Sequence, residues 1–339
     1  MGRRAALCRG RVGRVSAATL RPVGETRRAE LDAEHRRSWH EDGWCVLERA
    51  VPDEDLRGAQ RAVSRLLPAP TADGTGGDDP ERTPWLTWDA AWPEFPFRSR
   101  SLNRLVVGDV MLGLARTLLE TDDVRMYLAL VTAKYACQPS GYNQLLHVDF
   151  PNHSLVVPRD DVGYRQLETF VYLCDVGPDN GATHFVSRRR TAAIPVERHT
   201  LGYVDHGDLY VDDFVASAPA GSIVVYRPDV YHRSVDFSDR ARARFMLHVS
   251  YRPAPAEWGG YQAWPFKGFS AEWHDFAQRA TPPQLAVLGF PPPGHPYWTE
   301  ASLAGVQARY PGLDMAPWRE ALSASPWRAG GDGPKERAR

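Results

Sequence analysis

Three residues of types that bind metals stand at an informative spacing in this chain. His147 and Asp149 are two positions apart, and His232 follows 83 residues after Asp149. Two imidazoles and one carboxylate on one face of a metal are the ligand set with which non-haem Fe(II) oxygenases hold iron and leave other coordination positions open. The pattern therefore predicts an iron site.

The elements needed to assemble such a site can be read around the three residues. Alternate residues of a β-strand point to the same side, so a strand through Leu146–Asp149 sends His147 and Asp149 inward together. His232 must then arrive from another strand, and it lies just after the apolar run Ser222–Tyr226.

An arginine precedes the next apolar run. Arg240, Arg242 and Arg244 alternate before Phe245–Tyr251, which we interpret as a buried strand. A guanidinium fork at the start of this strand matches the carboxylate of a dicarboxylate cosubstrate. Arg244 is favoured because it directly abuts the apolar strand, and Arg242 is the alternative.

With these residues the chain resembles the phytanoyl-CoA dioxygenase family of Fe(II)- and 2-oxoglutarate-dependent oxygenases. The resemblance runs from about Trp39 to about Tyr251, and its ordered pieces are the segments His40–Leu47, His147–Asp149, Asp179–Val186, Gly221–Tyr226 and His232 with the arginine after it. It departs from the family where Val186–Arg190 replaces the Pro-Gly-Ser-His stretch that usually follows the Asn-Gly turn.

The resemblance implies the roles of individual residues. His147, Asp149 and His232 would be the catalytic residues and iron ligands, and Arg244 would bind the distal carboxylate of 2-oxoglutarate. The cofactors would be Fe(II), 2-oxoglutarate and O2, with release of succinate and CO2. Related halogenases replace the acid with a small residue, so the presence of Asp149 implies hydroxylation of an unactivated C–H bond or another oxidation.

Further side chains are candidates for the same site. Gln144 and Tyr135 would point toward the cavity if strand alternation holds, and could contact 2-oxoglutarate or the substrate. Lys134 has the opposite parity to Tyr135, which predicts an exposed position. His184 and His248 are interpreted as structural or as supporting residues, and His153 as either structural or a contact with substrate near the iron.

The predicted fold is mainly β with flanking helices (α+β), with a double-stranded β-helix (jelly-roll, cupin-like) core. A polar helix is expected near Glu30–Arg37, a first strand at Gly43–Glu48, a helix from Asp53, and another helix over residues 100–120. The expected later strands are residues 124–136, 142–150, 167–176, 183–187, 222–227 and 244–252. Residues 188–220 are interpreted as a polar insert, either a solvated loop or a lid over the iron.

The domain organisation follows from composition. We expect a flexible basic leader (1–28), which is a misassigned start or a targeting segment, and an oxygenase domain (29–253). An extension rich in Trp and Pro (254–328) is expected to pack on the core, followed by a disordered tail (329–339). Five tryptophans argue that the extension is ordered, because linkers are poor in aromatic residues; they are Trp258, Trp264, Trp273, Trp298 and Trp318.

Charge and cysteine content narrow the class of protein. The formal net charge of −1 argues against a general nucleic-acid or membrane-surface binder. The four cysteines show no zinc spacing, which favours a reducing, cytoplasmic setting. The expected partner is a small-molecule substrate, with the chain a monomer or homodimer. Two other hypotheses remain open: a non-catalytic binding barrel, and a zinc hydrolase with the same three ligands, which lacks an H-E-x-x-H glutamate as its base.

Overall fold

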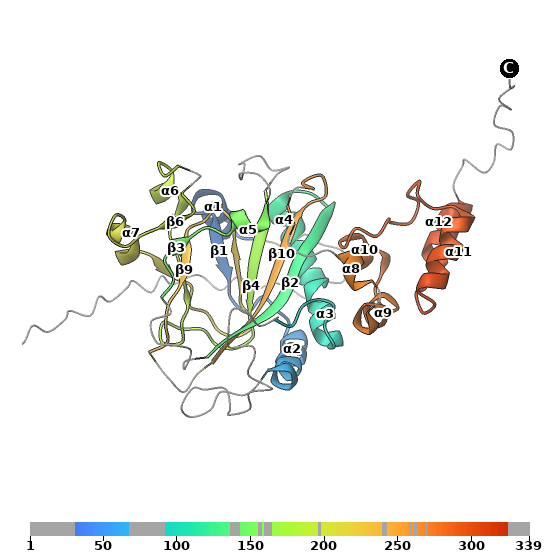
Figure 1. Cartoon of the computed structure of the whole chain (residues 1–339), viewed down its shortest axis with the longest axis horizontal. Coiled ribbons are helices and arrows are strands. Elements are labelled where there is room, and N and C mark those ends of the chain that lie inside the picture. The colour runs from blue at the N-terminus through green and yellow to red at the C-terminus, as the bar shows by residue number, and fades with distance from the viewer. Residues whose placement is uncertain are drawn as a thin grey trace, which may run out of the picture. The chain divides into compact units, whose positions relative to one another are not determined.

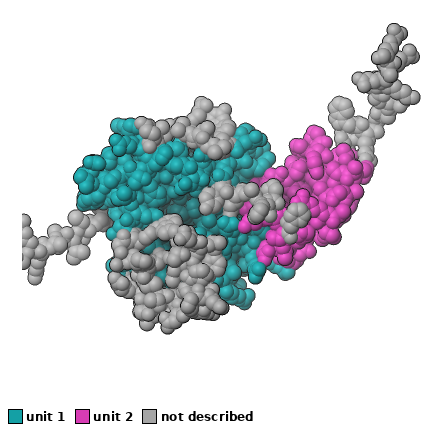
Figure 2. All heavy atoms as spheres, in the orientation of Figure 1, with its two compact units in different colours: residues 1–262 teal, residues 263–339 magenta. Residues whose placement is uncertain are grey.

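The computed structural model of the chain falls into two compact units, Met1–Gln262 and Ala263–Arg339, which are coloured separately in Figure 2. The described residues are 31–67, 92–135, 143–154, 158, 165–195, 198–238, 243–257, 259–260, 264–268 and 270–324. The predicted leader (1–28) and tail (329–339) lie outside them.

Two antiparallel sheets form the first unit (Figure 1). The first sheet has the strand order β1 (Trp44–Leu47), β8 (Ile223–Tyr226), β4 (Leu167–Tyr172), β10 (Ala243–Pro253) and β2 (Val124–Tyr135). The second has the order β6 (Thr200–Leu201), β3 (Leu146–His147), β9 (His232–Ser234), β5 (Thr183–Phe185) and β7 (Phe214–Val215).

The chain passes repeatedly between the two sheets, because β2, β4, β8 and β10 belong to the first and β3, β5, β7 and β9 to the second. This is the predicted jelly-roll arrangement. Its core packs between the sheets, where Phe170, Tyr172, Tyr226 and Met246 of the first sheet meet Phe185 of the second. All five side chains are buried, so this layer fixes the spacing of the sheets.

Helices flank the sheets. They are α1 (Ala33–Glu41), α2 (Asp53–Leu66), α3 (Arg100–Val106), α4 (Asp109–Leu119), α5 (Phe150–His153), α6 (Arg188–Thr191) and α7 (Gly207–Val211). The helix predicted from Asp53 is confirmed, with three acids in its first turn, where the helix dipole favours negative charge. Helix α4 packs against β2, β4 and β10, and α1 packs against β1.

The single helix expected over residues 100–120 is in fact two, α3 and α4. Helix α3 ends at Val106, and Gly108 is the N-cap of α4 with an extended backbone (φ −81°, ψ 166°). A Cβ on Gly108 would lie 2.7 Å from the carbonyl oxygen of Arg104, so only glycine allows this close turn.

Residues 188–220 are more structured than a loop. They contain α6, β6, α7 and β7, and the two strands form the edges of the second sheet. The interpretation as an insert that interrupts the strands was therefore wrong. Strands of only two residues give too little periodicity to be recognised in a sequence.

The second unit has an aromatic core of its own. It contains α8 (Trp264–Lys267), α9 (Ala271–Ala277), α10 (Pro282–Ala286), α11 (Glu300–Arg309) and α12 (Ala316–Ser323). The rings of Trp298 and Trp318 lie 5.8 Å apart, both indole N–H groups donate to the carbonyl of Pro291, and Phe290 packs on both rings. Aromatic packing thus holds the described residues of this unit together; the predicted extension over 254–328, packed on the barrel, stays a prediction.

The turn after β4 depends on Gly181, and Gly221, just before β8, offers a comparison because its φ is also positive. Gly181 (φ +72°) is surrounded closely: a Cβ would lie 2.9 Å from the Val235 carbonyl oxygen and 3.2 Å from the Phe237 ring. At Gly221 (φ +84°) the tightest contact of a Cβ would be the end of the Leu56 side chain, at 3.1 Å, and the nearest backbone atom, the Val51 carbonyl oxygen, would lie at an ordinary 3.6 Å. We expect Gly181→Ala to lower the free energy of unfolding by roughly 2 kcal/mol or more, since the left-handed backbone alone costs about 1–2 kcal/mol.

Gly221→Ala is the matched control in chemical denaturation, because it shares the backbone strain and lacks the backbone clash. It should be the less destabilised of the two variants. Equal losses would show that the close packing around Gly181 contributes nothing.

Candidate metal centre

One cross-strand pair brings together the two distant histidines. His147 of β3 and His232 of β9 are direct partners in the antiparallel register, and their ring centroids are 4.5 Å apart. Directly opposed residues of such a pair project to the same face. The prediction that His232 arrives from a neighbouring strand is therefore confirmed.

Asp149 reaches the same point by a different route from the one predicted. Strand β3 ends at His147, and Asp149 has a helical backbone (φ −86°, ψ −21°) at the N-cap of α5. The backbone N–H groups of Asp149 and Phe150 both donate to the carbonyl of Pro228, at 2.9 Å each. The expected strand over residues 142–150 is thus wrong, and a turn held by the Pro228 carbonyl orients the carboxylate.

The three side chains converge. One ligand atom from each of His147, Asp149 and His232 lies within 4.8 Å of the others. The Nε2 atom of His147 is 3.8 Å from Oδ1 of Asp149, and Nε2 of His232 is 3.4 Å from Oδ2. The side chain of His232 is 6% exposed and that of His147 is 26% exposed, so the cluster opens toward solvent on the His147 side.

The other ring nitrogen of each histidine is held by a backbone carbonyl. The Nδ1 atom of His147 lies 2.9 Å from the oxygen of Leu145, and Nδ1 of His232 lies 3.0 Å from the oxygen of Val230. A carbonyl only accepts hydrogen bonds, so each Nδ1 is the donor, and in the neutral imidazole each Nε2 then presents its lone pair to the cluster. This is the tautomer that a metal ligand needs.

Ionisation also suits metal binding. Burial raises the pKa of Asp149, but the neighbouring His232, His153 and His147 outweigh it, and the pKa lies below its ordinary value. Burial lowers the pKa of His232. A carboxylate beside neutral imidazoles is the form in which these groups bind a cation.

Tyr226 supports the carboxylate from the first sheet. Its hydroxyl donates to Oδ2 of Asp149 at 2.7 Å, and its ring centroid lies 5.0 Å from that of His232. Phe185 stacks on His232 with centroids 5.6 Å apart, and it also lies beside the Tyr226 ring, at 5.3 Å. Burial raises the pKa of Tyr226 well above its usual range, so its hydroxyl keeps the proton that it donates.

Arg244 is a buried cation. Its side chain donates from Nη1 to the carbonyl of Gly181, and its Nε has no hydrogen-bond partner among the described residues. No described carboxylate forms a salt bridge with it, so the guanidinium is suited to an anionic ligand. The alternative, Arg242, lies outside the described residues.

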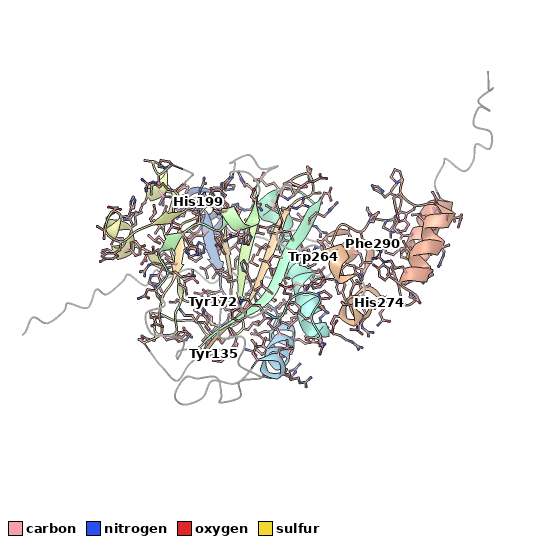
Figure 3. The ribbon with its side chains drawn as sticks, viewed as in Figure 1. Tyr135, Tyr172, His199, Trp264, His274 and Phe290 are labelled. Carbon is pink, nitrogen blue, oxygen red and sulfur yellow. The ribbon has the colours of Figure 1, made fainter. Side chains whose placement is uncertain are left out.

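Lys134, not Tyr135, shares the face of Arg244. Lys134 is the direct cross-strand partner of Arg244, whereas Tyr135 (labelled in Figure 3) pairs with Ala243, and its ring centroid lies 5.9 Å from that of Phe245. The parity predicted for these two residues was therefore reversed. Lys134 is 7% exposed and donates to Ser234 Oγ at 3.0 Å; burial and the charge of Arg244 lower its pKa to about 7, against the pull of Asp236.

Gln144 connects the strands that carry the histidines. Its side-chain oxygen accepts the backbone N–H of Ser234 at 2.9 Å, and its own backbone N–H donates to the carbonyl of Ser234. It thus extends the pairing of β3 with β9, and any contact with a cosubstrate stays a prediction.

A buried acid that sequence reasoning missed lies on the inner face of β4. Glu168 is fully buried, His153 Nδ1 lies 3.0 Å from Oε1, and His248 Nε2 lies 3.0 Å from Oε2. The expected structural or supporting role of His248 agrees with this contact. His184 pairs with Asp213 at 2.8 Å, also a structural role.

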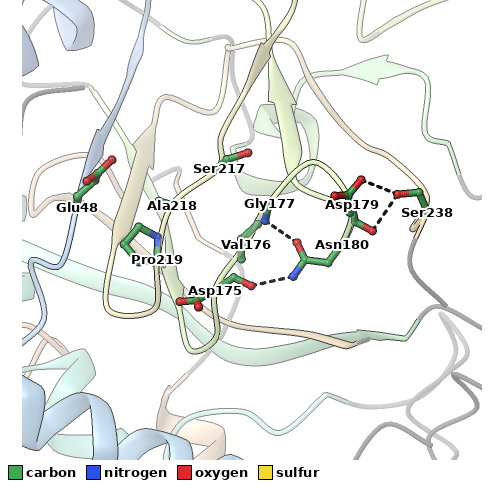
Figure 4. Close-up of a pocket in the computed structure, with 10 residues that line it drawn as sticks. All are labelled: Glu48, Asp175, Val176, Gly177, Asp179, Asn180, Ser217, Ala218, Pro219 and Ser238. Carbon is green, nitrogen blue, oxygen red and sulfur yellow. Dashed lines mark hydrogen bonds between the residues drawn. The ribbon is translucent and has the colours of Figure 1, made fainter. Parts of the chain in front are cut away.

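A hollow of about 800 Å³ elsewhere on this unit is not part of the cluster (Figure 4). The turns after β4 and before β8 line it. In the first of these turns the Asn180 side chain accepts the backbone N–H of Gly177 and donates to the carbonyl of Asp175. None of His147, Asp149 and His232 borders it, so the convergence of side chains, and not the size of a hollow, identifies the candidate centre.

The family model for phytanoyl-CoA dioxygenase (PhyH) matches residues 39–243, more than half of the chain and all three residues of the cluster. The chain belongs to the phytanoyl-CoA dioxygenase family. Its relatives are Fe(II)- and 2-oxoglutarate-dependent oxygenases, so this chain is an enzyme of that kind. The match ends at Ala243, one residue before Arg244.

Solved structures resemble this family member in fold. HygX from Streptomyces hygroscopicus with nickel and 2-oxoglutarate bound is 16% identical, covers 66% of this chain and 88% of its own, and has a TM-score of 0.47. EctD from S. alaskensis with 2-oxoglutarate and 5-hydroxyectoine is 17% identical, covers 69% and 80%, and has a TM-score of 0.49. Comparison with curated protein sequences found no match.

No helix among the described residues is long and apolar enough to cross a membrane.

The ion pair between Glu168 and His153 predicts how the stability of the metal-free protein depends on pH. Burial lowers the pKa of His153, but Glu168 and Asp149 outweigh it and raise the pKa to about 9 from 6.5. A raised pKa stabilises the fold fully below the unfolded value and ceases to do so as pH rises through the folded value. The unfolding free energy of wild type relative to His153→Gln should therefore fall by up to about 3 kcal/mol between pH 6 and 10.

Chemical denaturation in a chelator-containing buffer measures this difference. His40→Gln, which alters an exposed histidine of α1, should show no such fall. A difference between wild type and His153→Gln that stays constant over this pH range would contradict the pairing.

Proposed function

We propose that the protein is an Fe(II)- and 2-oxoglutarate-dependent dioxygenase that hydroxylates an unactivated C–H bond of a small-molecule metabolite, with release of succinate and CO2. The observation that carries the proposal is the convergence of His147, Asp149 and His232, with Nδ1 of both histidines held by backbone carbonyls and Nε2 toward the cluster. A buried cation without a carboxylate partner, Arg244, stands on the inner face of the same barrel.

The proposed iron ligands are Nε2 of His147, Nε2 of His232 and the carboxylate of Asp149. Tyr226 donates to Oδ2 of Asp149 and leaves Oδ1 for the metal. Three protein ligands on one side leave the remaining positions of an octahedral ion for 2-oxoglutarate and O2. When bound, iron supplies the oxidising chemistry, which amino-acid side chains lack.

The proposed site for the distal carboxylate of 2-oxoglutarate is Arg244, with Lys134 beside it. Two like charges at directly opposed positions repel each other, and their burial adds a cost that an anion between them would offset. Burial and the neighbouring charge of Arg244 both lower the pKa of Lys134, in agreement with this cost. The sequence left Arg242 open as an alternative, which the experiment below separates.

Buried aromatic side chains exclude water from one side of the proposed site. Phe185 and Tyr226 both pack on His232 and on each other, and Phe170 packs on Tyr226 with ring centroids 5.0 Å apart. Exclusion of water on this side strengthens the electrostatic contacts of the ligands and limits side reactions. The more exposed edge at His147 is where substrate would approach.

A zinc hydrolase with the same ligands is disfavoured. The hydrolases with an H-E-x-x-H motif use a free glutamate beside the zinc as general base. The buried acid nearest to the cluster in the described part of the chain is Glu168, whose oxygens are already contacted by His153, His248 and Ser250. The proposal also predicts turnover, which a non-catalytic barrel would lack.

Anaerobic addition of Fe(II) and 2-oxoglutarate tests the metal site directly. We expect a weak visible charge-transfer band in wild type and its loss in His232→Ala. His184→Ala is the matched control, because His184 is a strand histidine paired with Asp213 and not with the cluster. No band in wild type, or an unchanged band in His232→Ala, would refute the proposal.

The affinity for 2-oxoglutarate tests the cosubstrate site. Replacing Arg244 by Gln should raise the Kd by about 10- to 100-fold, because hydrogen bonds to a charged group contribute about 1.5–3 kcal/mol. Arg125→Gln, which alters an arginine paired with Asp123 at the far end of β2, should leave the Kd unchanged. If Arg242→Gln weakens binding and Arg244→Gln does not, the assignment of Arg244 is wrong.

A further inference from the structure

Glu168 is a charged group in the interior of the barrel that the proposed chemistry does not use. It has no exposed surface, and it accepts hydrogen bonds from the hydroxyls of Tyr127 and Ser250 and from His248 Nε2. His153 completes an ion pair at 3.0 Å. Burial raises the pKa of Glu168, but His153 and His248 outweigh it and hold the pKa well below its usual range, so the group is a carboxylate.

This carboxylate is connected to the candidate metal centre through the backbone. Asp149 is the N-cap of α5, and His153 is the last residue of the same helix. Glu168 of β4 is also the direct cross-strand partner of Tyr226, whose hydroxyl donates to Asp149. Asp149 is therefore linked to the Glu168 pair by the four residues of α5 and by one strand pairing.

Helix α5 is too short to be stable by itself, because one helical turn does not repay the cost of ordering it. Contacts at both ends hold it instead. At its start the Pro228 carbonyl accepts two backbone N–H groups. At its end the His153 carbonyl accepts from Gln166 Nε2 at 2.9 Å and from the Gly260 N–H at 3.1 Å, and the His153 ring pairs with Glu168.

The charges of the pair also bear on Asp149. Glu168 alone would be an uncompensated negative charge in the barrel interior, and the His153 ring 3.0 Å away pairs with it. Together the ion pair is neutral, so it fixes the end of α5 without adding net charge beside the ligand.

We propose that Glu168 and His153 are positioning residues that hold α5 so that the carboxylate of Asp149 is presented to the metal. The inference rests on the proposed metal site. Neither residue is assigned a contact with the metal or substrate. Residues that orient a metal-binding side chain without contacting the metal typically change metal affinity by about 10- to 100-fold when they are removed.

The test is the Kd for Co(II), measured by titration of the full-length, metal-free protein, with thermal unfolding in parallel. Glu168→Gln and His153→Gln should each weaken Co(II) binding by about 10- to 100-fold and alter the visible Co(II) spectrum, which reports ligand geometry. The matched control is His35→Gln. His35 is a buried histidine paired with Asp32 at 2.7 Å in α1, so its loss should lower stability and leave the Co(II) affinity within about twofold of wild type.

The double variant Glu168→Gln/His153→Gln keeps the test decisive if a single variant fails to fold. It replaces a buried ion pair by two neutral amides, so no uncompensated charge is left to destabilise the fold. We expect a folded protein with weakened Co(II) binding and an altered spectrum. Wild-type affinity and spectrum in the folded double variant would overturn the inference.

The wild-type titration separates this inference from the proposed function. If wild type binds no Co(II), the metal site itself is refuted, and the positioning role falls with it. If wild type binds Co(II) and the folded variants bind it equally well, only the role of Glu168 and His153 is refuted.

Discussion

A single cross-strand pair joins two histidines that lie 85 positions apart in the chain, and the candidate site is built around it. The pairing of His147 with His232 sets the separation of two imidazoles by the register of β3 and β9, not by flexible loops. The backbone carbonyls of Leu145 and Val230 then turn both rings so that Nε2 faces the same point. Whatever holds this register, including the two hydrogen bonds between Gln144 and Ser234, also maintains the site.

The remaining polar groups inside the barrel are arranged along β10. Arg244 and His248 lie on one face of that strand, about 13 Å apart at the usual rise per residue. At one end Arg244, with Lys134 beside it, carries positive charge that suits the carboxylate of a cosubstrate. At the other end His248 forms a hydrogen bond with Glu168. The cations Arg244 and Lys134 thus lie apart from the Glu168–His153 ion pair on the inner face, and Phe170, Tyr226 and Phe185 form an aromatic layer between the sheets.

The sequence predicted those features whose cause is local. Alternation and spacing identified His147 and His232, and the Asn-Gly turn was recognisable because Gly181 needs a positive φ. The turn at Asp149 was not predictable, since its backbone is held by a carbonyl, that of Pro228, which lies far away in sequence. Asp149 was assigned to the site correctly, but for the wrong geometric reason.

The parity of β2 could not be read either, because most of the residues on both of its faces are buried and the contrast that marks an inner face is absent. Only the register with β10 places Lys134 beside Arg244. Glu168 left a signal that was overlooked: it is the only acid between Leu167 and Cys174, an apolar run, and a buried carboxylate must find partners.

The central claim is that iron and 2-oxoglutarate bind between the His147–His232 pair and Arg244. A crystal structure of the protein grown without oxygen, with Fe(II) and 2-oxoglutarate, tests it most directly. The account predicts a metal held by Nε2 of both histidines and a carboxylate oxygen of Asp149, with the distal carboxylate of 2-oxoglutarate on the Arg244 guanidinium. A metal bound elsewhere, or a 2-oxoglutarate that does not contact Arg244, would contradict it.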